Sequence, residues 1–139
     1  MSTTSFHVTP GYGDLAHEML GYSQAVRVDN RVETSGQGGW DDGLSVRHDL
    51  DDEIVQAFDN LERTLAQAGA SWRHVTHINS YHKVAPGETV IGQDHNAVMT
   101  REFRHRLGDR APVWTQTGVT VLGLADMRIE IRATAVIDD

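Results

Sequence analysis

The alternation of apolar and polar residues is clearest near the end of the chain, over Arg128–Ile137. One face of this segment carries Ile129, Ile131, Ala133, Ala135 and Ile137, and the other carries Arg128, Glu130, Arg132 and Thr134. Successive side chains of a β-strand point to opposite faces, so the pattern predicts a strand with one buried and one polar face. The polar face is either solvated or turned toward a partner subunit, and periodicity alone does not distinguish the two.

Two segments have the spacing of three and four between apolar positions that is typical of an amphipathic helix. The first is Leu50–Ala68, where the apolar stripe consists of Ile54, Phe58, Leu61, Leu65 and Ala68. Acidic residues open this segment and Gly69 follows it, as expected at the two ends of a helix. The second is Thr89–Leu107, which Gly108 follows and which has on one side Met99, Phe103 and Leu107.

The remaining strands are predicted by five shorter runs, which are Ser5–Thr9, Ser23–Val28, Arg31–Gln37, Val75–His82 and Pro112–Val121. Asp29 and Asn30 suit a tight hairpin turn, because both residue types tolerate left-handed backbone angles. Pro10–Asp14 predicts a turn, and Gly36–Gly43 predicts a glycine-rich loop. The expected order is β-β-β-α-β-α-β-β, an α+β fold with two helices on one face of a mixed sheet.

Composition narrows the class of protein. The 139 residues suffice for one domain with its own core, so we expect a single domain over residues 1–139. A net charge of −8 disfavours a nucleic-acid partner, because phosphate binding requires a clustered basic surface. The lack of cysteine excludes disulfides and fits a reducing compartment. Without a signal peptide or an apolar run of roughly 20 residues, a cytoplasmic protein with no membrane partner is expected.

Few residues offer recognisable chemistry. The histidines lack metal-ligand spacing: His74 and His77 would point to opposite faces of a strand, and no metal site is predicted. His82 is the histidine best suited to titrate near neutral pH beside a pocket. Glu130 is the best candidate for a general acid or base, although Arg128 and Arg132 on the same face equally suit a charge-balanced surface.

Several short motifs, taken together and in order, resemble the RidA/YjgF family of reactive-intermediate deaminases. They are Tyr22–Val26 with Thr34–Gln37, Ala57–Leu61 through Ala68–Ser71, Gly118–Val119, and Arg128–Ala133. The resemblance runs from about Tyr22 to Ile137. It implies a chorismate-mutase-like fold that assembles as a homotrimer, a trimeric barrel whose inner surface is the polar face of the sheets. It also implies small-molecule clefts between subunits and no cofactor.

The same resemblance implies a set of site residues. Glu130 matches the catalytic glutamate that handles the attacking water when enamines and imines are hydrolysed to ketoacids and ammonia. The ligand-binding positions are Tyr22, Ser35, Gly36, Gln37, Asn96, Trp114, Thr115 and Gln116. Trp114 falls where the family has an arginine that grips the substrate carboxylate, and one indole N–H does not replace a guanidinium fork.

The departure at Trp114 changes the expected function. An indole at that position favours a flatter, less charged or aromatic ligand. We therefore expect hydrolysis of a non-standard enamine or imine, with ordinary 2-imino acid deaminase activity weak or absent. The alternative is a non-catalytic small-molecule-binding or regulatory trimer. The ribonuclease activity sometimes attached to the family fits the acidic charge poorly.

Overall fold

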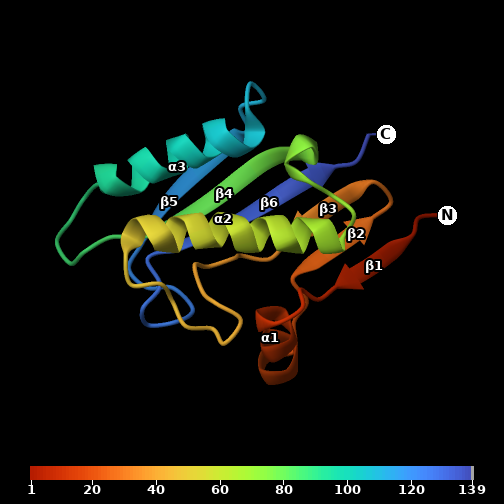
Figure 1. Cartoon of the computed structure of the whole chain (residues 1–139), viewed down its shortest axis with the longest axis horizontal. Helices are drawn as coiled ribbons and strands as arrows, with labels where there is room; N and C mark the ends of the chain where they lie inside the picture. The colour runs from red at the N-terminus through yellow and green to blue at the C-terminus, as the bar shows by residue number, and fades with distance from the viewer. Residues whose placement is uncertain (139) are drawn as a thin grey trace.

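The computed structural model describes residues 1–138. Its fold is built on a six-stranded mixed sheet (Figure 1). Its strands are β1 (Thr4–His7), β2 (Ala25–Val28), β3 (Arg31–Thr34), β4 (Val75–Lys83), β5 (Val113–Val119) and β6 (Ile129–Val136). Their spatial order is β1-β2-β3-β6-β4-β5, and all neighbours are antiparallel except β4 and β5. The predicted α+β fold and the predicted strands are confirmed, with ends that coincide or differ by up to three residues.

Two helices cover one face of this sheet, as predicted. They are α2 (Leu50–Gln67) and α3 (Gln93–Leu107), which lie side by side in Figure 1. The Asp49 side chain accepts a hydrogen bond from the backbone N–H of Asp52 at 3.1 Å and so caps α2. The apolar stripe of α2 is fully buried together with the alternate apolar residues of β6, and the two sets form the main core.

A third helix, α1 (Tyr12–Leu20), occupies a segment where the sequence predicts only a turn at Pro10–Asp14. The turn exists, but it leads into the helix. Gly11 has a positive φ of 89°, and its N–H donates to Asp14 Oδ2 at 3.0 Å, which fixes the first turn. Gly21 then ends the helix at a φ of 75°. In Figure 1, α1 stands apart from α2 and α3, below β2 and β3.

The connections also follow the predicted chemistry. Asp29 lies in the β2–β3 turn with a φ of 53°, the left-handed conformation expected there. A short 3₁₀-helix, Trp72–His74, joins α2 to β4. Within residues 1–138, no helix is both long enough and apolar enough to cross a membrane.

Candidate functional site

A pocket of about 250 Å³ opens beside Glu130, between α1, the loop that follows β3 and the segment that leads into β6. Four predicted site residues border it together: Tyr22, Ser35, Gly36 and Glu130. The rest of the lining comes from Ala16, Leu20, Trp40, Leu44, Gly123, Leu124 and Met127. Most of this wall is therefore apolar, and Glu130 is the one carboxylic acid among the described residues that line it.

Glu130 points away from α2 and α3, because its strand neighbours Ile129 and Ile131 are fully buried on the helix side. Partial burial raises the pKa of its carboxyl above the ordinary value. Its carboxylate lies directly against Gly36, where any Cβ would overlap it. Burial also raises the pKa of Tyr22, and the charge of Glu130 adds to this increase. Glu130 is thus partly desolvated, and its charge acts on the Tyr22 hydroxyl.

The glycine-rich loop is tied to α2 by Asn60, which is fully buried. The Asn60 amide donates to the backbone carbonyls of Gly38 and Trp40, each at 2.8 Å. Gly38 passes so close to the Trp40 ring that a side chain on it would overlap the indole. The loop is therefore a packed support for one pocket wall, and its glycines serve close approach rather than phosphate binding.

Gln37 supports the pocket from behind and does not line it. The residue is fully buried, and its Oε1 lies 2.6 Å from the Tyr12 hydroxyl. Its Nε2 donates to the backbone oxygen and to the Oγ of Ser35, both at 3.2 Å. Gln37 thereby positions Ser35, which does border the pocket.

Trp114 does not join this pocket. It lies in register with Ile78, whose side chain is fully buried on the helix side of the sheet. Its indole packs edge-on against Phe103 of α3 at a centroid distance of 5.0 Å, and its Nε1–H donates to Ser80 Oγ at 2.9 Å. Strand alternation places the next residue, Thr115, on the open face, where its hydroxyl lies 3.1 Å from His77 Nε2.

Gln116 and Asn96 also lie on the helix side, in a buried polar network with two histidines. Gln116 Nε2 donates to Asn96 Oδ1 at 2.6 Å and lies 3.3 Å from His82 Nε2. His82 Nδ1 and His95 Nδ1 are 3.0 Å apart. Burial, reinforced by the charge that His95 can carry, lowers the pKa of His82 to about 4. The expectation that His82 titrates near neutral pH is therefore wrong.

Neither Arg128 nor Arg132 forms an ion pair with Glu130. Arg128 lies just before the strand, and its backbone N–H and Nε–H both donate to the fully buried Glu53 carboxylate at 2.7 Å. Arg132 is paired with Glu33 of β3. The expected polar face with Arg128 beside Glu130 is thus wrong, because Arg128 turns toward α2. Among the described residues, none that lines the pocket is a lysine or an arginine.

The sequence interpretation missed the apolar half of the pocket, above all Ala16, Leu20 and Trp40. A signal for the first two was present: Tyr12, Ala16 and Leu20 recur at every fourth position, as on one side of a helix. Trp40 had no comparable signal, since a loop residue has no periodicity. In the described part of the chain, no group of three or more histidine or acidic residues is arranged to hold a metal ion.

Comparisons with known proteins agree with the fold. A family model described as endoribonuclease L-PSP matches residues 16–137. The RutC family protein YjgH of Escherichia coli strain K12 is 30% identical over 112 residues, which is 81% of each protein. A solved structure of protein YjgH covers 97% of both chains at 26% identity and a TM-score of 0.80. RidA from an Antarctic Psychrobacter covers 86% of this chain and 90% of its own, at 27% identity and a TM-score of 0.73.

Proposed function

Since this chain belongs to the YjgF/RidA family, whose model is described as endoribonuclease L-PSP, we propose that it hydrolyses an enamine- or imine-type metabolite beside Glu130. The observation that carries the proposal is the Glu130 carboxylate itself. It borders a pocket, its pKa is raised by burial, and no hydrogen bond or ion pair from residues 1–138 engages it. A carboxylate in that state is free to exchange a proton with a ligand or with water.

The chemistry needs one proton carrier and one water molecule. Glu130 takes a proton from water as the water oxygen attacks the carbon of the protonated imine, and the electron pair of the C=N bond moves to nitrogen, which gives a neutral carbinolamine. Protonated Glu130 then donates its proton to that nitrogen. The C–N bond breaks with its electron pair on nitrogen, and the hydroxyl proton of the carbinolamine passes to Glu130, which releases ammonia and leaves a carbonyl. An enamine enters this route after protonation at carbon. The raised pKa of Glu130 suits both halves of the cycle.

We further propose that the protein assembles as a homotrimer without a cofactor, with the open face of the sheet turned inward. The charged groups on that face support this arrangement. Glu33 accepts hydrogen bonds from Thr134 and pairs with both Arg31 and Arg132, so its charge is already compensated within one subunit. Burial of Glu33 against a second copy would therefore not leave the charge of that carboxylate unpaired.

Ribonuclease activity, which the family description names, finds less support in this chain. The net charge is −8, and no cation lines the pocket beside Glu130. Binding of a phosphodiester backbone depends on lysine and arginine contacts, and an acidic surface opposes it. The neutral or weakly basic nitrogen of an imine or enamine is the better match to a lone carboxylate.

The Glu130→Gln variant tests the proposed role. We expect turnover of imines generated in situ by an amine oxidase or an amino-acid oxidase to fall by at least about 100-fold, because the proton carrier is lost. Stability at pH 7 should be equal or higher, since burial disfavours the charged form of Glu130. Ammonia release and urea unfolding measure the two effects.

Glu18→Gln is the matched control, because Glu18 is exposed on α1 and does not line the pocket. It should leave turnover and stability unchanged. Undiminished turnover by Glu130→Gln would contradict the proposal. A wild-type protein that is stabilised by these compounds yet releases no ammonia would instead be the non-catalytic binding protein.

A further inference from the structure

We infer that the pocket selects imines and enamines with an apolar carbon skeleton and no carboxylate group, an inference that rests on the proposed function. Three independent features of the pocket support this choice of ligand. They are the apolar character of its walls, the absence of a cation to receive a ligand carboxylate, and the helix that forms its mouth.

The walls offer apolar surface of a suitable size. Trp40 supplies a rigid aromatic wall, since its ring packs edge-on against buried Tyr12 at a centroid distance of 5.7 Å. Met127, which is buried beside it, supplies a polarisable side chain that adapts to irregular shapes. The space of about 250 Å³ exceeds the roughly 150 Å³ in which benzene is accommodated inside a protein, so a phenyl-bearing ligand fits.

The charges oppose a ligand carboxylate. A carboxylate placed in the pocket would lie near Glu130, and among residues 1–138 of the same subunit no lining cation compensates either charge. Arg128 and Arg132 are already committed to Glu53 and Glu33. The strand on which the family resemblance places a carboxylate-binding arginine, β5, reads Val-Trp-Thr-Gln-Thr-Gly-Val and carries no cation on either face.

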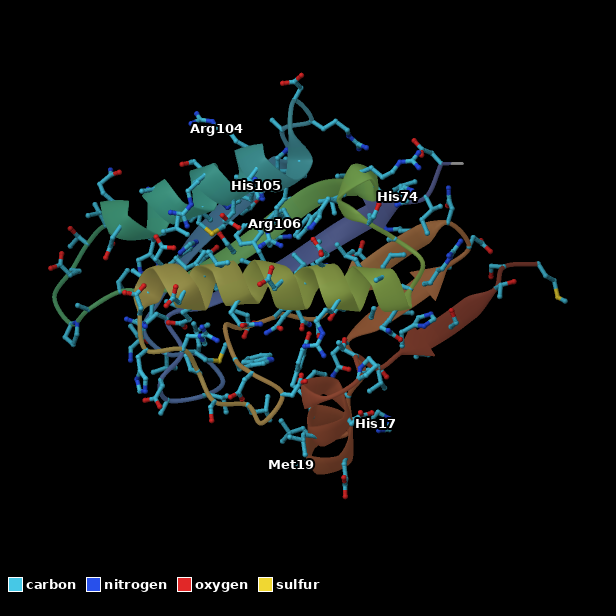
Figure 2. The ribbon with its side chains drawn as sticks, in the orientation of Figure 1. His17, Met19, His74, Arg104, His105 and Arg106 are labelled. Carbon is cyan, nitrogen blue, oxygen red and sulfur yellow. The ribbon has the colours of Figure 1, made fainter. Side chains whose placement is uncertain are left out.

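Helix α1 closes the remaining side and brings Leu20 to the mouth of the pocket. Ala16 on the same helix is buried beneath it, whereas Leu20 is 73% exposed while it lines the opening. Its neighbour Met19 is similarly exposed, at 69%, but does not line the pocket. Met19 lies on α1 on the side of the molecule away from α3 (Figure 2). Leu20 is therefore a specificity residue that can be changed without disturbing the core.

Two ketones that differ only in the presence of a carboxylate test the inference directly. 4-Phenylbutan-2-one carries a methyl group where 2-oxo-4-phenylbutanoate carries the carboxylate. Both are hydrolysis products of the matching imines, so their binding reports recognition without turnover. We expect calorimetric titration to show that the methyl ketone binds at least about tenfold more tightly. Equal or tighter binding of the carboxylate, or no binding of either ketone, would overturn the inference.

A charge-matched pair of variants assigns the selectivity to the mouth of the pocket. Leu20→Arg places a cation at the opening and should shift the affinity ratio of the two ketones toward the carboxylate by about fivefold, the upper range for an exposed ion pair. Met19→Arg adds the same charge one residue away and should leave the ratio unchanged. Equal shifts of the affinity ratio in both variants would show a general charge effect, and Leu20 would then not be a specificity residue.

Turnover of the corresponding imines separates this inference from the proposed function. The two imines are made in situ, from 4-phenylbutan-2-amine by an amine oxidase and from homophenylalanine by an amino-acid oxidase. Selective binding of the methyl ketone without hydrolysis of either imine would leave the ligand class in place and refute the hydrolytic function. Faster hydrolysis of the carboxylate-bearing imine would support hydrolysis and refute the ligand class.

Discussion

The position of the Glu130 carboxylate in the site depends on its contact with Gly36. The glutamate leans against a backbone position that has no side chain, and any Cβ there would overlap its carboxylate. The carboxylate is consequently held near the pocket by shape rather than by hydrogen bonds. A group positioned in this way keeps its lone pairs available to a ligand or to water, which a salt-bridged carboxylate does not.

Gly36→Ala should therefore displace Glu130. We expect a loss of about 1–3 kcal/mol in the free energy of unfolding, the usual cost of overpacking, and at least a tenfold loss of turnover. Gly43→Ala in the same loop is the control, because a Cβ there approaches only the exposed Asp41 side chain, at 3.4 Å. Urea unfolding and ammonia release measure both effects, and wild-type values for Gly36→Ala would show that the contact is not restrictive.

Among the elements, β5 shows how the alternation of one strand decides which side chains can act. Matching to the family aligns Trp114 with the carboxylate-binding arginine. In the structure, Trp114 packs on the helix side of β5, and Thr115 lies on the open face. The register with β4 explains this, because Ile78 and Ser80 are both fully buried opposite Trp114 and Gln116. A shift of one residue along a strand exchanges its two faces.

The network under Trp114 joins a serine and two histidines. The indole N–H donates to Ser80 Oγ at 2.9 Å, and the same oxygen lies 2.7 Å from His82 Nε2. His82 Nδ1 in turn lies 3.0 Å from His95 Nδ1. Burial and the neighbouring His95 together lower the pKa of His82.

Stability should consequently fall in mild acid. Unfolded His82 binds a proton near pH 6.5 but folded His82 only at about pH 4, so between these values the unfolded state holds more protons. The free energy of unfolding should drop by roughly 3 kcal/mol across this window. In urea unfolding at several pH values, His82→Gln should flatten the decline, with a remainder due to His95, whose pKa burial also lowers.

The control for this experiment is His105→Gln, since His105 is exposed on α3 (Figure 2). The variant should keep the wild-type slope, because His105 takes no part in the buried network of His82 and His95. An equally steep decline in His82→Gln would show that the network does not cause the acid sensitivity.

Sequence periodicity was a sound guide to the elements that bury a long apolar stripe, such as α2 and β6. It missed α1, whose nine residues follow a Pro-Gly pair that by itself indicates only a turn. The pocket was harder to predict, because Leu20, Trp40 and Glu130 come from three segments that only the tertiary structure brings together. Single residues such as Tyr22 and Ser35 were predicted as site residues from the family motif, because hydrophobic periodicity gave no signal for them.

At the scale of the whole molecule, the sheet has one covered and one open face. The helices bury one side, while the other carries half-buried polar residues such as Asn79, Tyr81 and Glu130. A half-buried polar face of this extent suits association with identical copies, in keeping with the proposed trimer. Light scattering should then give three times the 15.4 kDa of the chain.

Thr117→Glu tests which face forms the contact. Thr117 is exposed on the open face of β5, and three like charges brought together there should weaken the trimer. Gln67→Glu adds the same charge at an exposed position at the end of α2 and should leave the assembly intact. A monomeric wild-type protein, or dissociation caused by Gln67→Glu alone, would contradict the proposed arrangement.

Two of the buried polar residues of α2 have a consequence for how the protein acquires its activity. Asn60 holds the glycine-rich loop, and Glu53 holds the segment that leads into β6. Releasing either segment would strand a polar group in the interior, so the pocket does not open piecemeal. We therefore expect a nascent chain to gain its binding site in the same cooperative step in which α2 docks.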